Sequence, residues 1–349
     1  MTVDRSKPLR QVLPAKPSVA FAFEPDHAQG VLDAASLLRI TELCSVLDPA
    51  PMASFETEAA RALLGRAEIL ITSWGCPPIT ADLLSRAPHL RLVAHAAGSV
   101  KTFISPEVFS AGVAVTNAAS ANAVPVAEFT LAAILFANKR VFRYRDIYRQ
   151  DRRQIPWSAL ADPDVGNKGK TVGIVGYSRI GARVIELLQP FDLEVLLYDP
   201  YYVIDASDQR RVRSVGLDQL MAEADVVSLH APAIEATARM IDAGRLALMQ
   251  DGATLINTAR GALVDQDALV RELVSGRISA VIDVTTPEVL PADSPLYGLP
   301  NVLLTPHIAG ALGNERSRLG ATVVAEIERF IAGLPLSHGV AAETLHLQA

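Results

Sequence analysis

The sequence predicts an α/β fold of two doubly wound parallel-sheet domains, and three observations support this prediction. Short β-branched runs alternate with helical stretches along most of the 349 residues, as in a parallel sheet covered by helices. A chain of this length exceeds one ordinary core, so two domains are expected. A strand, a glycine-rich turn, a helix and a second strand also follow one another between residues 170 and 199, which is typical of a dinucleotide-binding unit.

The first third of the chain has the strand and helix alternation of one such sheet. Apolar runs predict strands at 18–23, 44–47, 68–73, 92–96 and 113–116. The helical stretches between them are expected at 25–39, 56–64 and 81–86. Ligands of such sheets bind beyond the carboxyl ends of the strands, so Trp74 and the loop of Ala97, Gly98 and Ser99 are candidate substrate contacts.

One long helix is expected over 125–150, with Pro125 in its first turn. Its second half is dense in Arg, Tyr and Asp, which indicates either a solvated face or an arm toward a second subunit. The polar stretch 151–167 should be a loop. The apolar centre of the expected helix, 131–137, is far short of the roughly 20 residues that cross a bilayer.

The second half of the chain repeats the alternation. Strands are predicted at 171–175, 194–198, 226–230, 254–257, 280–283 and 302–305. A last helix should bury a stripe with one apolar residue every four positions, namely Leu319, Val323, Ile327 and Ile331.

The glycine-rich turn is a candidate phosphate loop. Residues 176–181, Gly-Tyr-Ser-Arg-Ile-Gly, match the frame Gly-x-Gly-x-x-Gly except at Ser178, and the helix that follows offers free N–H groups to a pyrophosphate. Asp199 ends the next strand, 199 − 181 = 18 residues after the last glycine, where it can accept hydrogen bonds from a ribose. An ordinary tight turn is the alternative.

The residues after Asp199 favour NAD over NADP. Pro200, Tyr201 and Tyr202 follow it, so a 2′-phosphate would meet a carboxylate without a neighbouring cation. The arginines at 210, 211 and 213 come later and could fold back toward that position.

Three chemically distinctive side chains follow predicted strands on the same edge. Arg260 can bind a carboxylate through two parallel hydrogen bonds, and His307 can exchange a proton near neutral pH. Glu288 can orient that histidine and stabilise its protonated form. Taken singly, they could be a salt-bridge partner, a structural histidine and a solvated loop residue, but together at strand ends they indicate a catalytic site.

These motifs resemble the D-isomer-specific 2-hydroxyacid dehydrogenases. The resemblance lies in the arginine motif at 257–265, the aspartate-to-glutamate motif at 283–288, the histidine motif at 300–310, the nucleotide loop at 172–181 and the start of the linking helix at 125–128. It covers nearly the whole chain and is weakest before residue 60. The departures are Ser178, the sequence Ser99-Val100-Lys101 after Gly98, and Val289 after Glu288.

The resemblance implies a Rossmann NAD-binding domain at 120–311 and a flavodoxin-like substrate domain at 1–119 plus 312–349. His307 would be the acid/base for a D-2-hydroxy or 2-keto acid, Glu288 its partner and Arg260 the substrate clamp. Asp283 would lie near the nicotinamide and tune the histidine. Cofactor contacts are implied for Gly176, Tyr177, Ser178, Arg179, Ile180, Asp199, His230, Pro232, Thr237, Thr258, Ala259, Arg260, Asp283, His307, Ala309 and Gly310. The Arg- and Tyr-rich helix would form a homodimer.

Composition excludes several other classes. The net charge of −6 and the pI of about 5.7 provide no basic surface for nucleic acid. Cys44 and Cys76 match neither a metal spacing nor a disulfide framework, so no metal and a cytoplasmic setting are expected, with no membrane partner. An NAD(H)-sensing co-repressor-like regulator on the same fold is the alternative function, and a methyltransferase would not need the arginine, glutamate and histidine together.

Overall fold

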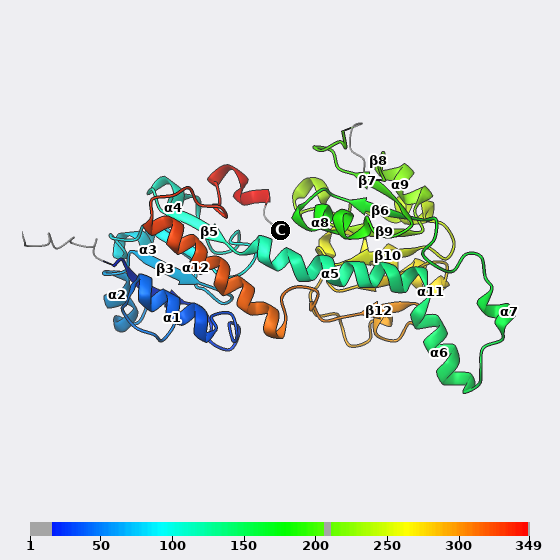
Figure 1. Ribbon diagram of the computed structural model, residues 1–349, viewed down its shortest axis with the longest axis horizontal. Helices are drawn as coiled ribbons and strands as arrows, with labels where there is room; N and C mark the ends of the chain where they lie inside the picture. Colours follow the sequence, from blue (N-terminus) through cyan, green and yellow to red (C-terminus); the bar gives the residue numbers. More distant parts are fainter. Residues whose placement is uncertain (1–15, 206–210, 348–349) are drawn as a thin grey trace, which may run out of the picture. The chain divides into compact units, whose positions relative to one another are not determined.

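The computed structural model describes residues 16–205 and 211–347, which fold into two compact units (Figure 1). Of the described residues, unit 1 contains 16–96, Phe103–Thr116 and Gly320–Gly339. Unit 2 contains Ala97–Thr102, 117–205, 211–319 and 340–347. The predicted boundaries differ from these units at 97–102, 117–119, 312–319 and after residue 339, all of which belong to unit 2.

Unit 1 is built on a five-stranded sheet with the order β2-β1-β3-β4-β5. Its strands β1 and β3 pair in parallel, as do β3 and β4. The strands are β1 (Ser18–Ala22), β2 (Ser45–Val46), β3 (Ile69–Thr72), β4 (Leu92–His95) and β5 (Ala114–Asn117). The helices are α1 (Ala34–Leu43), α2 (Glu58–Leu64), α3 (Ala81–Arg86), α4 (Pro106–Ser110) and α12 (Ser317–Ile331). The predicted strands are therefore confirmed within two residues, whereas α4 was not predicted.

The predicted helix at 25–39 was wrong over its first half. Residues 24–31 form turns, in which the Val31 amide donates to the Ala28 carbonyl, and Gly30 has a φ of 74°. Helix α1 begins at Ala34 because the side chain of Asp33 caps it by accepting from the Ser36 amide at 2.8 Å. The hydrogen bond of this cap fixes the start of the helix at Ala34, although the residues before it also have a helical composition.

Helix α12 packs within unit 1 through the predicted apolar stripe. Leu319, Val323 and Ile327 are buried, whereas Ile331 at the end of the helix is 39 % exposed. Gly320 lies close to the backbone of Val31, which precedes α1. A Cβ on Gly320 would be 2.2 Å from the Val31 carbonyl oxygen. The glycine is therefore what lets α12 sit against residue 31.

Unit 2 contains a seven-stranded sheet with the order β12-β11-β10-β9-β6-β7-β8, and all its neighbouring strands run parallel. The strand order reverses between β6 and β9, which is where ligands bind in such sheets. The strands are β6 (Lys170–Val175), β7 (Leu193–Tyr198), β8 (Val212–Ser214), β9 (Val226–Leu229), β10 (Thr254–Asn257), β11 (Ser279–Ile282) and β12 (Val302–Leu304). Only β8 was not predicted.

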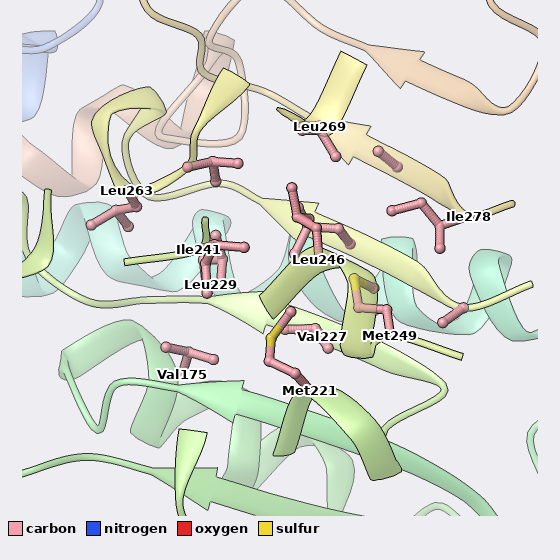
Figure 2. Close-up of a cluster of buried hydrophobic side chains, with 14 of the residues drawn as sticks. Val175, Met221, Val227, Leu229, Ile241, Leu246, Met249, Leu263, Leu269 and Ile278 are labelled. Atoms are coloured by element: carbon pink, nitrogen blue, oxygen red, sulfur yellow. The ribbon is translucent and has the colours of Figure 1, made fainter. Parts of the chain in front are cut away.

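Helices cover both faces of this sheet, because both faces are apolar. On one face, side chains such as Val227, Leu229 and Leu246 form the cluster drawn in Figure 2. On the other, Ile134, Ile174 and Ile185 lie in a second cluster. The helices of the first face are α9 (Leu217–Glu223), α10 (Ala243–Leu248) and α11 (Gln266–Ser275), and those of the second are α5 (Ala119–Asn138) and α8 (Arg179–Leu188).

The single long helix predicted over 125–150 is two helices. Helix α5 starts at Ala119, within an alanine-rich run, and ends before Arg140, whose φ of 48° is left-handed. Helix α6 (Val141–Asp151) follows, and the predicted loop after it contains the short α7 (Trp157–Leu160). Figure 1 shows α5 lying along the sheet of unit 2.

The early start of α5 makes the apolar helix longer than the predicted centre at 131–137. With 20 residues, α5 is by length and composition alone long and apolar enough to cross a bilayer, so the prediction of a much shorter apolar stretch was wrong. The helix nevertheless contributes Ala127 and Ile134 to the buried core of unit 2. Helix α5 is therefore packed as a core helix of unit 2.

Candidate active site

The carboxyl ends of the unit 2 strands form one edge, and most of the predicted site residues follow them. The glycine-rich loop comes after β6 and Asp199 after β7. The neighbouring strands β10, β11 and β12 are followed by Arg260, Glu288 and His307. The fold therefore places on one edge residues that are up to 131 positions apart (307 − 176).

The glycine-rich loop fits a pyrophosphate. Gly176 has a φ of 102°, and a Cβ there would be 2.8 Å from the Ala231 amide nitrogen. Ser178 is the N-cap of α8, since its Oγ accepts from the Gly181 amide at 3.2 Å. The amides of Arg179 and Ile180 donate to no acceptor among the described residues. The serine thus caps the helix and leaves two N–H groups for an anion.

Asp199 joins the two loops on either side of it. Its Oδ2 accepts from the Tyr177 amide at 2.7 Å and its Oδ1 from the Tyr201 amide at 2.8 Å. A carboxylate has about four lone-pair sites, so each oxygen can still accept from a ribose hydroxyl. Of the three later arginines, Arg211 pairs with Asp192 and Arg213 with Glu223, and position 210 lies outside the described residues.

His230, after β9, is a buried part of the scaffold. Its Nε2 is 2.9 Å from the Ser228 hydroxyl, and burial lowers the pKa of the imidazole to about 3. Thr237 closes its own loop, donating from Oγ1 to the Pro232 carbonyl at 2.5 Å and accepting from the Ile234 amide at 3.0 Å. In this structure, therefore, these side chains organise the loop beside the glycine-rich turn.

His307 and Glu288 lie in direct contact. The His307 Nδ1 is 2.5 Å from the Glu288 Oε1, and both side chains are about half exposed, at 49 % and 59 %. The Thr285 hydroxyl holds the glutamate turn by donating to the Pro287 and Glu288 carbonyls at 2.8 and 2.9 Å. With Nδ1 engaged by the carboxylate, the opposite ring nitrogen, Nε2, is the one left to act on a ligand.

Asp283 holds the backbone that carries this histidine. Its buried carboxylate accepts from the Thr305 hydroxyl at 2.6 Å and from the Ile308 and Ala309 amides at 2.8 and 2.9 Å. Its carbonyl accepts from the His307 amide at 2.9 Å. The φ of His307 is 56°, a left-handed conformation that a non-glycine residue keeps only where its surroundings fix it.

Arg260 is a half-buried cation that forms no ion pair with a described carboxylate. Within the described part of the chain, its guanidinium donates only to the Ala259 carbonyl, at 2.6 Å. The Asn257 side chain fixes the turn by accepting from the Ala259 amide and donating to the Arg260 carbonyl. Burial lowers the pKa of Arg260, and the charge of Glu288 opposes that shift. Thr258 is buried and bonds Thr130 at 3.1 Å.

The predicted substrate contacts fall in both units. Trp74 belongs to unit 1, where it is half-buried and its carbonyl accepts from the Glu24 amide at 3.1 Å. Ala97, Gly98 and Ser99 belong to unit 2. Their amides donate to no acceptor among the described residues, and no atom lies within 4 Å of a Cβ placed on Gly98. The loop thus has donors free for a carboxylate.

Sequence reasoning missed Asn122, in the first turns of α5. Its Oδ1 accepts from the Ala311 amide at 2.9 Å, and a Cβ on Gly310 would be 3.1 Å from the same oxygen. Asn122 therefore holds the chain just after the histidine motif. A single amide side chain in the alanine-rich run 118–127 was the available signal.

Neither cysteine has the environment of a nucleophile. Burial raises the pKa of Cys44 to about 11 and also raises the pKa of Cys76. Among the residues that the structure describes, no group of three or more His, Cys, Asp or Glu side chains could hold a metal ion.

Comparison with known proteins gives the family. Residues 131–309 match the family model described as D-isomer specific 2-hydroxyacid dehydrogenase, NAD binding domain. The glyoxylate reductase of Korarchaeum cryptofilum is 36 % identical over 257 residues, 73 % of this chain and 77 % of that protein. The hydroxypyruvate reductase of Blautia hydrogenotrophica is 29 % identical over 84 % of this chain and 91 % of that protein.

The D-lactate dehydrogenase of Aquifex aeolicus, solved with NAD and lactic acid, is similar in structure. It is 28 % identical, with a TM-score of 0.66 over 90 % of this chain and 96 % of that one. The fold and the comparisons together define an NAD(P)-dependent oxidoreductase acting on the CH–OH group of its donors. The chain belongs to the D-isomer-specific 2-hydroxyacid dehydrogenase family. The comparisons offer no support for the regulator alternative.

Proposed function

We propose that this enzyme interconverts a D-2-hydroxy acid and its 2-keto acid with NAD as cofactor, using His307 as acid/base, Glu288 as its partner and Arg260 as substrate clamp. The observation that carries the proposal is the 2.5 Å contact between His307, after β12, and Glu288, after β11. Arg260 follows the next strand, β10, and forms no ion pair with a described carboxylate. A half-buried guanidinium that pairs with no described carboxylate is suited to a carboxylate ligand.

In the proposed reaction, substrate binding and proton transfer are carried out by different groups. Arg260 and the amides of Ala97 to Ser99 bind the carboxylate of the substrate. When bound, the nicotinamide supplies or accepts the hydride. His307 donates a proton to the carbonyl oxygen in reduction and accepts it from the hydroxyl in oxidation. Glu288 holds the imidazole in the orientation that presents its other nitrogen. These groups contribute by positioning and by stabilising charge.

The preference for NAD over NADP is part of the proposal. Asp199 places a carboxylate at the adenosine end, and no described Lys or Arg side chain pairs with it. A 2′-phosphate beside it would bring two like charges together. Matched proteins solved with NADPH and with NAD both exist, so the choice of cofactor is specific to each chain.

A substrate panel tests the proposed function. NADH oxidation should be followed with small 2-keto acids, and the product should have the D configuration. In Arg260→Lys the KM for the keto acid should rise about 10-fold or more with a smaller change in kcat, because a lysine loses the two-pronged contact. The proposal fails if no 2-keto acid is reduced by wild-type enzyme that binds NADH.

We also propose a homodimer formed through α5 to α7. Phe136, Tyr148 and Trp157 on this segment are exposed, and the described residues of α6 include none that is buried. An apolar surface of this kind favours a partner. Light scattering should give twice the 37.3 kDa chain mass, and Trp157→Ser with Phe136→Ser should lower it. A cytoplasmic location stays a prediction, and the two free cysteines agree with it.

A further inference from the structure

Two tyrosine rings stack next to Asp199. Tyr177, from the glycine-rich loop, and Tyr202, from the loop after β7, lie with ring centroids 3.8 Å apart and ring planes 7° apart. Tyr177 also packs against the buried cluster between the sheet, α5 and α8. The stack therefore connects an exposed loop to a part of the molecule that is fixed by its core. We call these two rings the tyrosine stack.

The tyrosine stack and Asp199 join the same two loops. One oxygen of the carboxylate holds the Tyr177 amide and the other holds the Tyr201 amide, while the stack pairs the rings of Tyr177 and Tyr202. The spacing of the loops is thus set twice, once by hydrogen bonds and once by ring contact. Tyr201 takes part only through its backbone, because its side chain is 88 % exposed.

We infer that the tyrosine stack is a specificity determinant for the adenosine end of the cofactor, because it keeps the two loops too close for a 2′-phosphate beside Asp199. The inference rests on the proposed placement of the adenosine ribose at this carboxylate. A ribose diol needs only the two free acceptor sites of Asp199. A phosphate needs more room and a cation, and making room would require the loops to separate and the rings to part.

The size of the effect follows from the contact. An aromatic pair contributes enough to change a binding ratio by about 2- to 10-fold. The charge of Asp199 should have the larger influence, because it acts directly on the phosphate. Asp199 should therefore determine that NADH binds more tightly than NADPH, and the tyrosine stack should change only the size of that difference.

The test is equilibrium binding of NADH and NADPH, measured by nucleotide fluorescence without any keto acid. In Tyr202→Ala the ratio of the NADPH to the NADH dissociation constant should fall about 2- to 10-fold. Tyr202→Phe keeps the ring and should keep the ratio, which separates the stack from any contact of the hydroxyl. Tyr202→Leu provides a second variant without a stack if the alanine protein folds poorly.

Tyr201→Ala is the matched control, since it removes a neighbouring tyrosine that has no place in the stack. Its ratio should equal that of the wild type. An unchanged ratio in both Tyr202→Ala and Tyr202→Leu, or an equal change in Tyr201→Ala, would overturn the inference. Asp199→Asn separates the two proposals: if it leaves the ratio unchanged, the placement of the ribose is wrong, and if it alone shifts the ratio, only the stack is wrong.

Discussion

The carboxyl edge of the unit 2 sheet has a His307 end and an Asp199 end. They differ in whether the side chains that hold the backbone are also the ones proposed to contact the ligand. At the His307 end, the side chains proposed to act are Arg260, Glu288 and His307, while a separate, buried Asp283 holds the backbone. At the Asp199 end, one carboxylate both holds two loops and presents its remaining acceptors. Two aspartates that follow strands of the same sheet therefore have different roles.

The difference lies in how many acceptor sites the chain itself occupies. Asp283 is 2 % exposed and accepts three hydrogen bonds from its own chain, so it has little capacity for a ligand. Asp199 is half-buried and accepts two. At the His307 end, damage to the scaffold should affect stability and catalysis together, whereas at the Asp199 end it should affect cofactor choice.

The largest effect on stability is expected for Asp283→Ala. The half-buried Thr305 hydroxyl and Ile308 amide and the buried Ala309 amide would lose their acceptor, and an unsatisfied buried group costs about 1–3 kcal/mol. The free energy of unfolding, measured with urea, should fall by about 2–3 kcal/mol. Asp283→Asn keeps one acceptor oxygen and should lose less. Equal stability of the alanine variant and the wild type would show that Asp283 is not the scaffold of this end.

Gly261→Ala should also disturb the His307 end, through the contact between the loop of Arg260 and the loop of Glu288. A Cβ there would be 2.3 Å from the carbonyl carbon of Thr285, so the loop of Arg260 and the loop of Glu288 could not keep their present approach. Overpacking of this kind costs about 1–3 kcal/mol. The matched control is Gly298→Ala, where no atom lies within 4 Å and φ is −113°. The two variants should differ in denaturation midpoint and in KM for the keto acid. Similar values would contradict the close contact.

Near neutral pH the effect of His230 on stability should be the smallest of the three, and it contrasts a buried histidine with the exposed His307. Its pKa is lowered to about 3 in the folded chain, so below about pH 6.5 the unfolded chain binds a proton that the folded chain does not. This histidine therefore lowers stability progressively as the pH falls from about 6.5 to about 3, by up to about 1.4 kcal/mol per pH unit.

In His230→Asn, the slope of unfolding free energy against pH should be shallower than in wild type over that window. Above about pH 7.5 the two curves should run parallel, because the imidazole is neutral in both states. Identical slopes below pH 6 would mean that this ring is not buried as a neutral group.

The sequence predicted well those elements whose local signals agree with their packing. Strand β10 and helix α3 have the bounds that were predicted, Thr254–Asn257 and Ala81–Arg86, because turns or loops flank an uninterrupted run. The prediction failed where one residue overrides composition, as with the cap at Asp33 and the left-handed Arg140. Pro125 was expected to start a helix that in fact begins six residues earlier.

The site was predictable for residues that follow strands, because parallel strands bring their carboxyl ends to one edge. The His307–Glu288 contact is an example. Roles that depend on three-dimensional contacts were not accessible. Nothing in the sequence indicates that Asp283 would use its carboxylate on the backbone after Thr305, or that Asn122 would bond Ala311 from 189 positions away.

The most direct test of the account is the single-turnover rate of NADH oxidation by a 2-keto acid in His307→Asn. If His307 is the acid/base, that rate should fall by about 10²- to 10⁴-fold, the usual contribution of a positioned proton donor, while the NADH dissociation constant stays within about 2-fold. His89→Asn, at an exposed histidine of unit 1, should keep the wild-type rate. A His307→Asn rate within about 3-fold of wild type would contradict the account.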